Sequence, residues 1–289
     1  MTKSHLYDRL IADYCPTVNH LLKTKKTMAE ERITPTKVGS HNEIEYVEHL
    51  ARYTFAARFV KNGSRGLDIA CGAGYGTDIL LTAGASAFYG VDKSSESIEY
   101  ARARYKTAGL EFIRSDALQA QFPAEYFDMI TSFETIEHLE AEKGEVFIQM
   151  LNGWLKKGGV LLLSCPNRDT YPKGYAKNVF HLHEYSYREI EALLGKYFAN
   201  ITVYCQKMRY FKRAYKKIVQ LSRHLPKKFT IRAANHAHFE YTLKKDLKYL
   251  PLFRRLALYE YFFGHEVFPF VEDYRFFKPV FFVFAAKKG

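Results

Sequence analysis

Short apolar runs alternate with amphipathic stretches through the middle of the chain, and this alternation limits the possible folds more than any other feature. Five runs have the length and composition of buried strands: GLDIA, AFYGVD, LEFIRSD, FDMITSF and GGVLLLSC. A sixth run, NITVYCQ, follows, and a seventh, FKPVFFVFAAKKG, ends the chain. Strands separated by helical segments favour a doubly wound parallel sheet. The sequence therefore predicts an α/β, Rossmann-like fold with seven strands.

The same pattern predicts the domain boundaries. The core is expected to comprise residues 42–206 and 277–289, beginning with apolar residues at helical spacing over 42–61. Residues 1–41 are polar and predict an N-terminal helical extension. Residues 207–276 separate the sixth strand from the last and predict an insertion or lid, so the core sheet is interrupted just before its final strand.

The positive charge of the chain is concentrated in that predicted insertion. The net charge is +12, and residues 207–279 hold 17 Lys/Arg against 6 Asp/Glu, together with 17 Phe/Tyr. Such a segment favours an anionic partner: a nucleic acid, a lipid headgroup or a pyrophosphate. We expect peripheral contact with a membrane surface through 207–276. The alternative is that the lysines keep an aromatic-rich lid soluble.

The cellular location follows from what the sequence lacks. It has no run of 18 apolar residues and no N-terminal pattern typical of a secretory signal. Its four cysteines are scattered, as is usual for reduced thiols. We therefore expect a cytoplasmic protein, placed at the inner face of the membrane if the basic segment binds lipid.

A glycine-rich turn follows the first predicted strand. The segment runs Asp68-Ile-Ala-Cys-Gly72-Ala-Gly74-Tyr-Gly76-Thr. Glycines between a strand and a helix let the backbone approach a ligand closely, and the helix N-terminus favours polar or anionic groups. This pattern alone suits NAD, FAD or S-adenosylmethionine.

Acidic residues at three successive strand ends distinguish these cofactors. Asp68 precedes the turn and suits a cationic ligand better than a pyrophosphate. Asp92 ends the next strand, where a carboxylate can accept both ribose hydroxyls. Asp116 ends the third strand and is placed to bind an adenine amino group. The three acids favour S-adenosylmethionine.

The segments GLDIACGAGYGT, GVDKS, RSDA, FDMITSFETIEHL and LKKGGVLLLSCPN occur in the order of the class I methyltransferase motifs, which they resemble. The resemblance covers about residues 42–206 and the last strand. It implies S-adenosylmethionine as cofactor, with Asp68, Gly72 and Gly74 near the methionine moiety. It also implies that Asp92 binds the ribose and that Asp116 and Ala117 flank the adenine.

Two clusters offer groups for chemistry on the acceptor. An alcohol must lose its proton on methylation, to a general base or with the help of a metal ion. In SFETIEHL, Glu134, Glu137 and His138 have the spacing i, i+3, i+4, so one helical face is expected to present all three. His138 is one candidate for the base or for a ligand of the substrate, and His181 in FHLHEYS is the other. We expect His183 to be structural.

The ExxEH element and the later loop histidine resemble the metal-dependent 2′-O-methyltransferases of small-RNA 3′ ends and the ubiquinone-pathway O-methyltransferases. The resemblance implies that Glu134, Glu137, His138 and His181 hold Mg²⁺ or Mn²⁺. This mixture of oxygen and nitrogen ligands suits Mn²⁺ or Zn²⁺ equally well. In the alternative interpretation, Glu137 is a solvated helix residue and His138 packs beneath the cofactor.

Three further elements resemble bacterial methyltransferases of surface-polysaccharide and O-antigen biosynthesis: Glu31-Arg32 with Pro35, His49 with Arg52 and Tyr53, and Phe180-His181 with Glu184. That resemblance implies that Arg52 and Tyr53 contact the cofactor or close over it. The alternative is an ordinary covering helix.

Together these features predict a cytoplasmic S-adenosylmethionine-dependent O-methyltransferase acting on a sugar hydroxyl of a glycan or glycolipid precursor. The alternatives are a metal-dependent RNA 2′-O-methyltransferase, a small-molecule O- or N-methyltransferase, and a non-enzymatic cofactor-binding scaffold. Nucleic acid is the less favoured partner, because no RNA-binding module is recognisable in the sequence.

Overall fold

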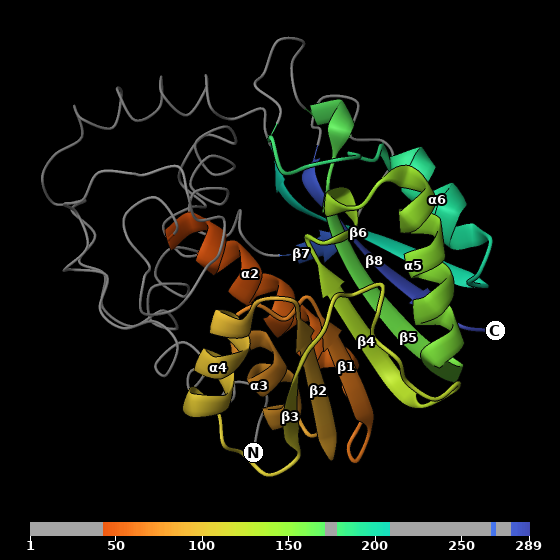
Figure 1. The fold of residues 1–289 in the computed structure, drawn as a ribbon. Helices are drawn as coiled ribbons and strands as arrows, with labels where there is room; N and C mark the ends of the chain where they lie inside the picture. The colour runs from red at the N-terminus through yellow and green to blue at the C-terminus, as the bar shows by residue number, and fades with distance from the viewer. Residues whose placement is uncertain (1–42, 171–177, 209–266, 270–278) are drawn as a thin grey trace, which may run out of the picture.

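The computed structural model describes residues 43–170, 178–208, 267–269 and 279–289 (Figure 1). The helical elements are α2 (Glu43–Ala56), η2 (Ala57–Phe59), α3 (Tyr75–Thr82), α4 (Ser95–Arg104), η3 (Ile136–His138), α5 (Ala141–Trp154), η4 (Arg168–Thr170) and α6 (Tyr187–Gly195). The strands are β1 (Arg65–Ile69), β2 (Ala87–Asp92), β3 (Leu110–Arg114), β4 (Phe127–Phe133), β5 (Leu155–Pro166), β6 (Asn200–Met208), β7 (Val267–Pro269) and β8 (Pro279–Lys287).

The strands form one mixed sheet in the order β3-β2-β1-β4-β5-β8-β6-β7. Strands β1 to β5 pair in parallel, whereas β8 runs antiparallel to both β5 and β6. All seven predicted strands are present, which confirms the doubly wound Rossmann-like fold. The three-residue strand β7, antiparallel to β6, was not predicted, because three residues are too few to show a strand pattern.

Helices cover both faces of the sheet, α5 and α6 on one and α2, α3 and α4 on the other (Figure 1). Side chains alternate between the faces along each strand, so Leu161 and Leu163 join the apolar cluster beneath α5 and α6. Leu162 joins the second cluster, together with Phe55 of α2 and Leu80 of α3. The two clusters pack the helices onto the two faces of the sheet. The carboxyl ends of the parallel strands therefore stay together at one edge.

Several predictions concern other parts of the chain. The N-terminal extension, with Glu31, Arg32 and Pro35, lies outside the described residues, as does nearly all of the basic segment 207–276. The domain boundaries therefore stay predictions. Within the described ranges, no helix has both the length and the apolar character needed to cross a bilayer.

Candidate functional site

Apart from Tyr53 on α2, the predicted cofactor residues lie at or just beyond the carboxyl ends of β1, β2 and β3. In open α/β sheets, ligands bind at this edge, where the strand order reverses. Here the order reverses at β1, which has β2 on one side and β4 on the other. The fold therefore gathers acids that are far apart in the sequence beside the glycine-rich turn.

Glycine is required in the turn between β1 and α3 for two reasons. Gly74 has φ 80°, and a Cβ there would lie 2.7 Å from both Ala101 Cβ and the Phe112 ring. Gly72 has φ 54°, and a Cβ there would meet no heavy atom within 4 Å. Gly74 thus lets the turn pack against α4 and β3, and the open space beside Gly72 suits a ligand.

Asp92 fastens this turn to the end of β2. Its Oδ2 accepts a hydrogen bond from Gly72 N–H at 2.9 Å, and its Oδ1 accepts one from Ser94 N–H at 2.8 Å. The side chain is half-buried. Because each carboxylate oxygen has two lone pairs, Asp92 keeps acceptor capacity for the ribose hydroxyls that the sequence assigns to it.

Asp116 continues the same edge beyond β3. Ser115 N–H donates to the Asp92 carbonyl at 3.1 Å, which joins the two strand ends. The exposed Asp116 accepts from Leu118 N–H at 2.9 Å, and Ala117 beside it is half-buried. This placement is compatible with the predicted adenine contacts.

Asp68 lies deeper than the other two acids and is fully buried. Its carboxylate accepts hydrogen bonds from Thr77 and Thr131 at 2.8 Å and from the Tyr53 hydroxyl at 3.2 Å. Burial raises the pKa of Asp68 to about 7, although these three hydroxyl donors act in the opposite direction. Asp68 therefore links β1 to α2, α3 and β4.

Tyr53 carries the predicted cofactor contact of α2. Its hydroxyl is committed to Asp68, and its ring packs edge-on against Tyr75 and Phe133. Only 4% of the residue is exposed. Direct contact with the cofactor stays a prediction, and the contact present in the structure runs through Asp68.

The ExxEH element has a different local structure from the predicted one. Only Ile136–His138 is helical, as a single 3₁₀ turn, and Glu134 lies outside it with φ 51°. The prediction that one helical face presents Glu134, Glu137 and His138 is therefore wrong. Glu134 N–H pairs with the Ser164 carbonyl of β5 at 3.1 Å, and this pairing continues the β4–β5 ladder past the end of β4.

Glu134 is held apart from the histidines. Its carboxylate accepts from the Ser164 hydroxyl at 2.7 Å and lies 3.7 Å from the guanidinium of Arg52, which is buried on α2. Arg52 and Tyr53 are consecutive, so α2 contacts both Glu134 and Asp68. The helix therefore connects the end of β1 with the segment that follows β4.

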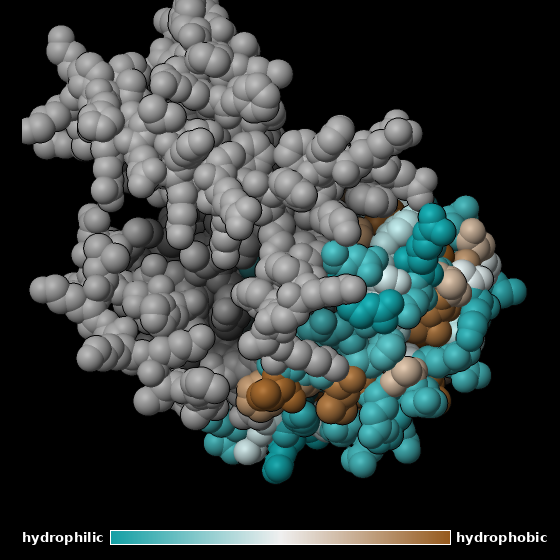
Figure 2. Space-filling model, turned by 90° about the horizontal axis from the view of Figure 1, so that it is seen from above, coloured by the Kyte–Doolittle hydropathy of each residue, from teal (hydrophilic) through white to brown (hydrophobic). Residues whose placement is uncertain are grey.

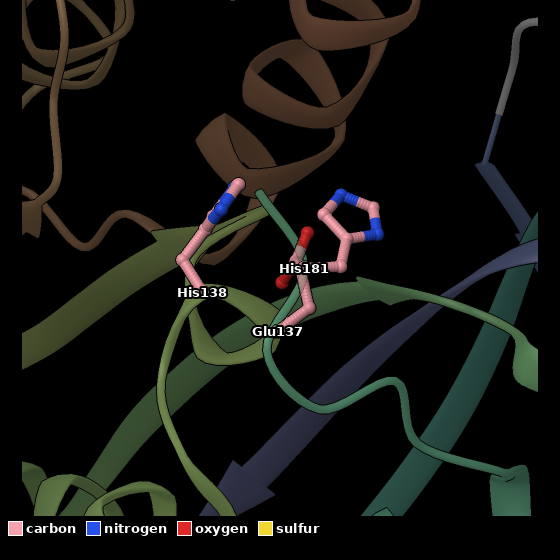
Figure 3. A group of neighbouring side chains, drawn as sticks. All are labelled: Glu137, His138 and His181. Carbon is pink, nitrogen blue, oxygen red and sulfur yellow. The ribbon is translucent and has the colours of Figure 1, made fainter. Parts of the chain in front are cut away.

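Glu137, His138 and His181 do lie together (Figure 3). Glu137 and His138 come from the turn after β4, and His181 comes from the loop before α6. The two imidazole centres are 5.2 Å apart, with their planes at 81°. Glu137 is 1% exposed, so the alternative interpretation of a solvated helix residue is wrong.

Hydrogen bonds fix both histidines. His138 Nδ1 lies 3.0 Å from the Phe180 carbonyl. His181 Nδ1 lies 2.9 Å from the Glu184 carboxylate, and His181 Nε2 lies 3.0 Å from the Asn178 amide nitrogen. His183 packs on Tyr185, with ring centres 4.4 Å apart, and its structural role stays a prediction.

The donors only partly fit the predicted four-ligand metal site. Glu137, His138 and His181 each offer an atom within 4.8 Å of the others. Glu134 is not in this group, and Nε2 of His181 already faces the Asn178 amide. A divalent ion bound at His181 would have to displace either that amide or the Glu184 carboxylate, so the donors as arranged do not form the predicted site.

Sequence reasoning missed Asn178, Ser164 and Thr131, which hold the candidate residues in place. A single polar residue on a strand or loop gives no pattern that reveals its tertiary partner. It also missed an apolar cluster on the histidine loop, Val179, Phe180 and Leu182, which are 80%, 49% and 57% exposed. On the face that Figure 2 shows, the described surface is mostly hydrophilic, with separate apolar groups.

Comparison with known proteins agrees with this geometry. Residues 67–163 match the model of a methyltransferase domain. The crystal structure of a SAM-dependent methyltransferase from Archaeoglobus fulgidus superposes with a TM-score of 0.55 at 16% identity, covering 85% of this chain and 95% of that one. Residues 67–163 therefore match a methyltransferase domain, and the described residues have the corresponding fold.

Two relatives come from Mycolicibacterium smegmatis. A probable S-adenosylmethionine-dependent methyltransferase is 31% identical over 130 residues, covering 44% of this chain and 49% of the relative. A fatty-acid O-methyltransferase is 34% identical over 111 residues, covering 38% and 40%. The chain thus spans about half, or less, of the length of these curated relatives.

Proposed function

We propose that the protein is an S-adenosylmethionine-dependent O-methyltransferase that methylates a sugar hydroxyl of a glycan or glycolipid precursor. The observation that carries the proposal is the placement of His138 just beyond the carboxyl end of β4, with His181 beside it, next to the strand that bears the glycine turn. A histidine at this edge is suited to accept the proton that a hydroxyl group loses on methylation.

In the proposed reaction the acceptor oxygen forms a bond to the methyl carbon while its proton passes to an imidazole nitrogen. The bound cofactor supplies a methyl group on a sulfonium, whose carbon–sulfur bond breaks and leaves a neutral thioether. The products are a methyl ether, the thioether and an imidazolium. Much of the rate would come from holding the acceptor in line, since binding replaces a bimolecular encounter.

A lipid-linked acceptor is supported by the cluster of Val179, Phe180 and Leu182. Exposed apolar side chains gathered at one place commonly mark a site of interaction. These three flank His181, so an acceptor with an apolar part can rest on them while its hydroxyl faces the histidines. The similarity to a fatty-acid O-methyltransferase favours a second candidate, in which the lipid itself is methylated.

The test is transfer of labelled methyl groups from S-adenosylmethionine to fractionated cell material, with and without EDTA. Label that enters a glycolipid or polysaccharide fraction equally well with and without EDTA would support the proposal. Label in a simple lipid would favour the second candidate. Label in RNA that is lost with EDTA and restored by Mn²⁺ would overturn the proposal.

The apolar cluster has a test of its own. The double variant Val179→Ser/Leu182→Ser removes two apolar contacts, each worth about 1.5 kcal/mol, and should lower transfer to a membrane-bound acceptor about tenfold or more. Val146→Ser is the matched control, because Val146 is 50% exposed but lies on α5. Equal effects of the two changes would contradict a role for the loop.

A further inference from the structure

The two histidines belong to one chain of hydrogen bonds, whose donors and acceptors can be assigned from their partners. The Phe180 carbonyl can only accept, so Nδ1 of His138 carries a proton and donates at 3.0 Å. Phe180 N–H donates to Oδ1 of Asn178 at 3.1 Å, which fixes the orientation of that amide. The amide N–H of Asn178 therefore faces His181.

The rest of the chain follows from the amide orientation. Nε2 of His181 must accept from Asn178 at 3.0 Å, so the proton of the neutral ring lies on Nδ1. That Nδ1–H donates to the Glu184 carboxylate at 2.9 Å. Both partners are shielded, since the side chains of His181 and Glu184 are 11% and 12% exposed. The chain of hydrogen bonds thus runs from Glu184 through His181, Asn178 and Phe180 to His138.

The two imidazole rings differ in whether a nitrogen remains without a hydrogen-bond partner among the described residues. In His181 both nitrogens are engaged, Nδ1 with Glu184 and Nε2 with Asn178. In His138 only Nδ1 has a hydrogen-bond partner among the described residues, and Nε2 carries the lone pair. Of the two predicted bases, His138 is the one able to take a proton without first breaking a hydrogen bond.

We infer that His138 Nε2 is the atom that accepts the acceptor's proton, and that Glu184, His181 and Asn178 are positioning residues that fix its tautomer and orientation. This inference rests on the proposed function for its chemistry. The positive charge that His138 gains faces the Phe180 carbonyl. Phe180 N–H and the Phe180 carbonyl belong to different peptide groups, so Glu184, His181 and Asn178 act on His138 by holding that carbonyl in place.

The tautomers can be tested without any acceptor, by ¹⁵N NMR of the imidazole nitrogens at pH 8.5. Signals are assigned with His138→Gln, His181→Gln and, as a control on the same loop, His183→Gln. We expect a protonated Nδ1 and an unprotonated Nε2 in both His138 and His181. A proton on Nε2 of either ring would overturn the inference, whatever the acceptor proves to be.

The division of roles is tested by chemical rescue in the methyl-transfer assay. His138→Gly should lower kcat on the order of 100-fold or more, as loss of a general base does, and added imidazole should restore part of it. His181→Gly should not be rescued, because its ring fills a fixed place in the chain. Rescue of His181→Gly alone would make His181 the base and contradict the inference.

The positioning role of the residues farthest from His138 in the hydrogen-bond chain is tested with Glu184→Ala and Asn178→Ala. Each breaks at least one hydrogen bond, so kcat should fall about tenfold while KM for the cofactor stays within about twofold. His183→Gln should match the wild type. Unchanged kcat in both variants would contradict a positioning role, whereas correct tautomers without any methyl transfer would count against the proposed function alone.

Discussion

Asp68 combines complete burial with three hydroxyl donors, and its burial raises the pKa of the carboxyl group to about 7. Taking a carboxylate out of water disfavours its charged form, and the donors only partly compensate. The residue joins α2, α3 and β4 to the end of β1, so its protonation affects the elements that shape the cofactor side of the edge.

Asp68→Asn should remove a pH dependence of stability. Below about pH 4 the carboxyl is protonated in both the folded and the unfolded chain. Between pH 4 and about 7 the unfolded chain ionises first, so the free energy of unfolding of the wild type falls as pH rises. The loss is at most about 4 kcal/mol. Urea unfolding of both proteins from pH 4 to 8 would show a difference that grows toward pH 7, and a constant difference would contradict the raised pKa.

Gly74→Ala should destabilise the protein strongly. An alanine there combines a left-handed backbone with a Cβ 2.7 Å from Ala101 and Phe112, which costs about 2–4 kcal/mol. The control is Gly153→Ala on α5, where a Cβ meets nothing within 4 Å and alanine is expected to stabilise by up to about 1 kcal/mol. Similar thermal midpoints for the two variants would show that the turn is not closely packed.

At the level of elements, the N-terminus of α6 anchors the histidine loop. Ser186 accepts from Glu189 N–H at 3.3 Å, and Glu189 accepts from Ser186 N–H at 2.8 Å, which completes a capping box. The box begins two residues after Glu184, so it fixes the end of the loop from which the hydrogen-bond chain starts.

Ser186→Ala should lower the free energy of unfolding by about 1 kcal/mol, because one N–H of the first turn loses its acceptor. Ser95→Ala is the matched control, since Ser95 is an exposed first-turn residue of α4 whose cap is Ser94. Chemical denaturation measures both changes. If Ser95→Ala costs as much as Ser186→Ala, the capping box contributes nothing specific.

The elements also show where sequence reasoning succeeds and fails. Runs such as FDMITSF and GGVLLLSC predict strands reliably, because a buried parallel strand needs apolar residues on both faces. The spacing in SFETIEHL suggested a helix, yet Glu134 adopts φ 51° and only a 3₁₀ turn follows. That outcome depends on the pairing of Glu134 with Ser164 of β5, which no local spacing reveals.

At the level of the whole molecule, the order of the motifs predicted the sheet and the edge where ligands bind. Asp92 and Asp116 lie there because parallel strands end together, a property of the fold class. The roles of Asn178 and Glu184 could not be predicted, because they depend on which way one loop folds over the turn after β4. Tyr53 donates its hydroxyl hydrogen bond to Asp68, a partner that the sequence did not reveal, and its contact with the cofactor stays a prediction.

The central claim is that the edge formed by Gly72 and Asp92 binds S-adenosylmethionine, and isothermal titration calorimetry tests it most directly. The wild type should bind one equivalent of the cofactor. Asp92→Ala should bind about 10- to 100-fold more weakly, since it loses charge-assisted hydrogen bonds to the ribose and the contact with Gly72 N–H. Glu99→Gln, an exposed change on α4, should bind like the wild type. No binding by the wild type, or equal binding by Asp92→Ala, would contradict the account.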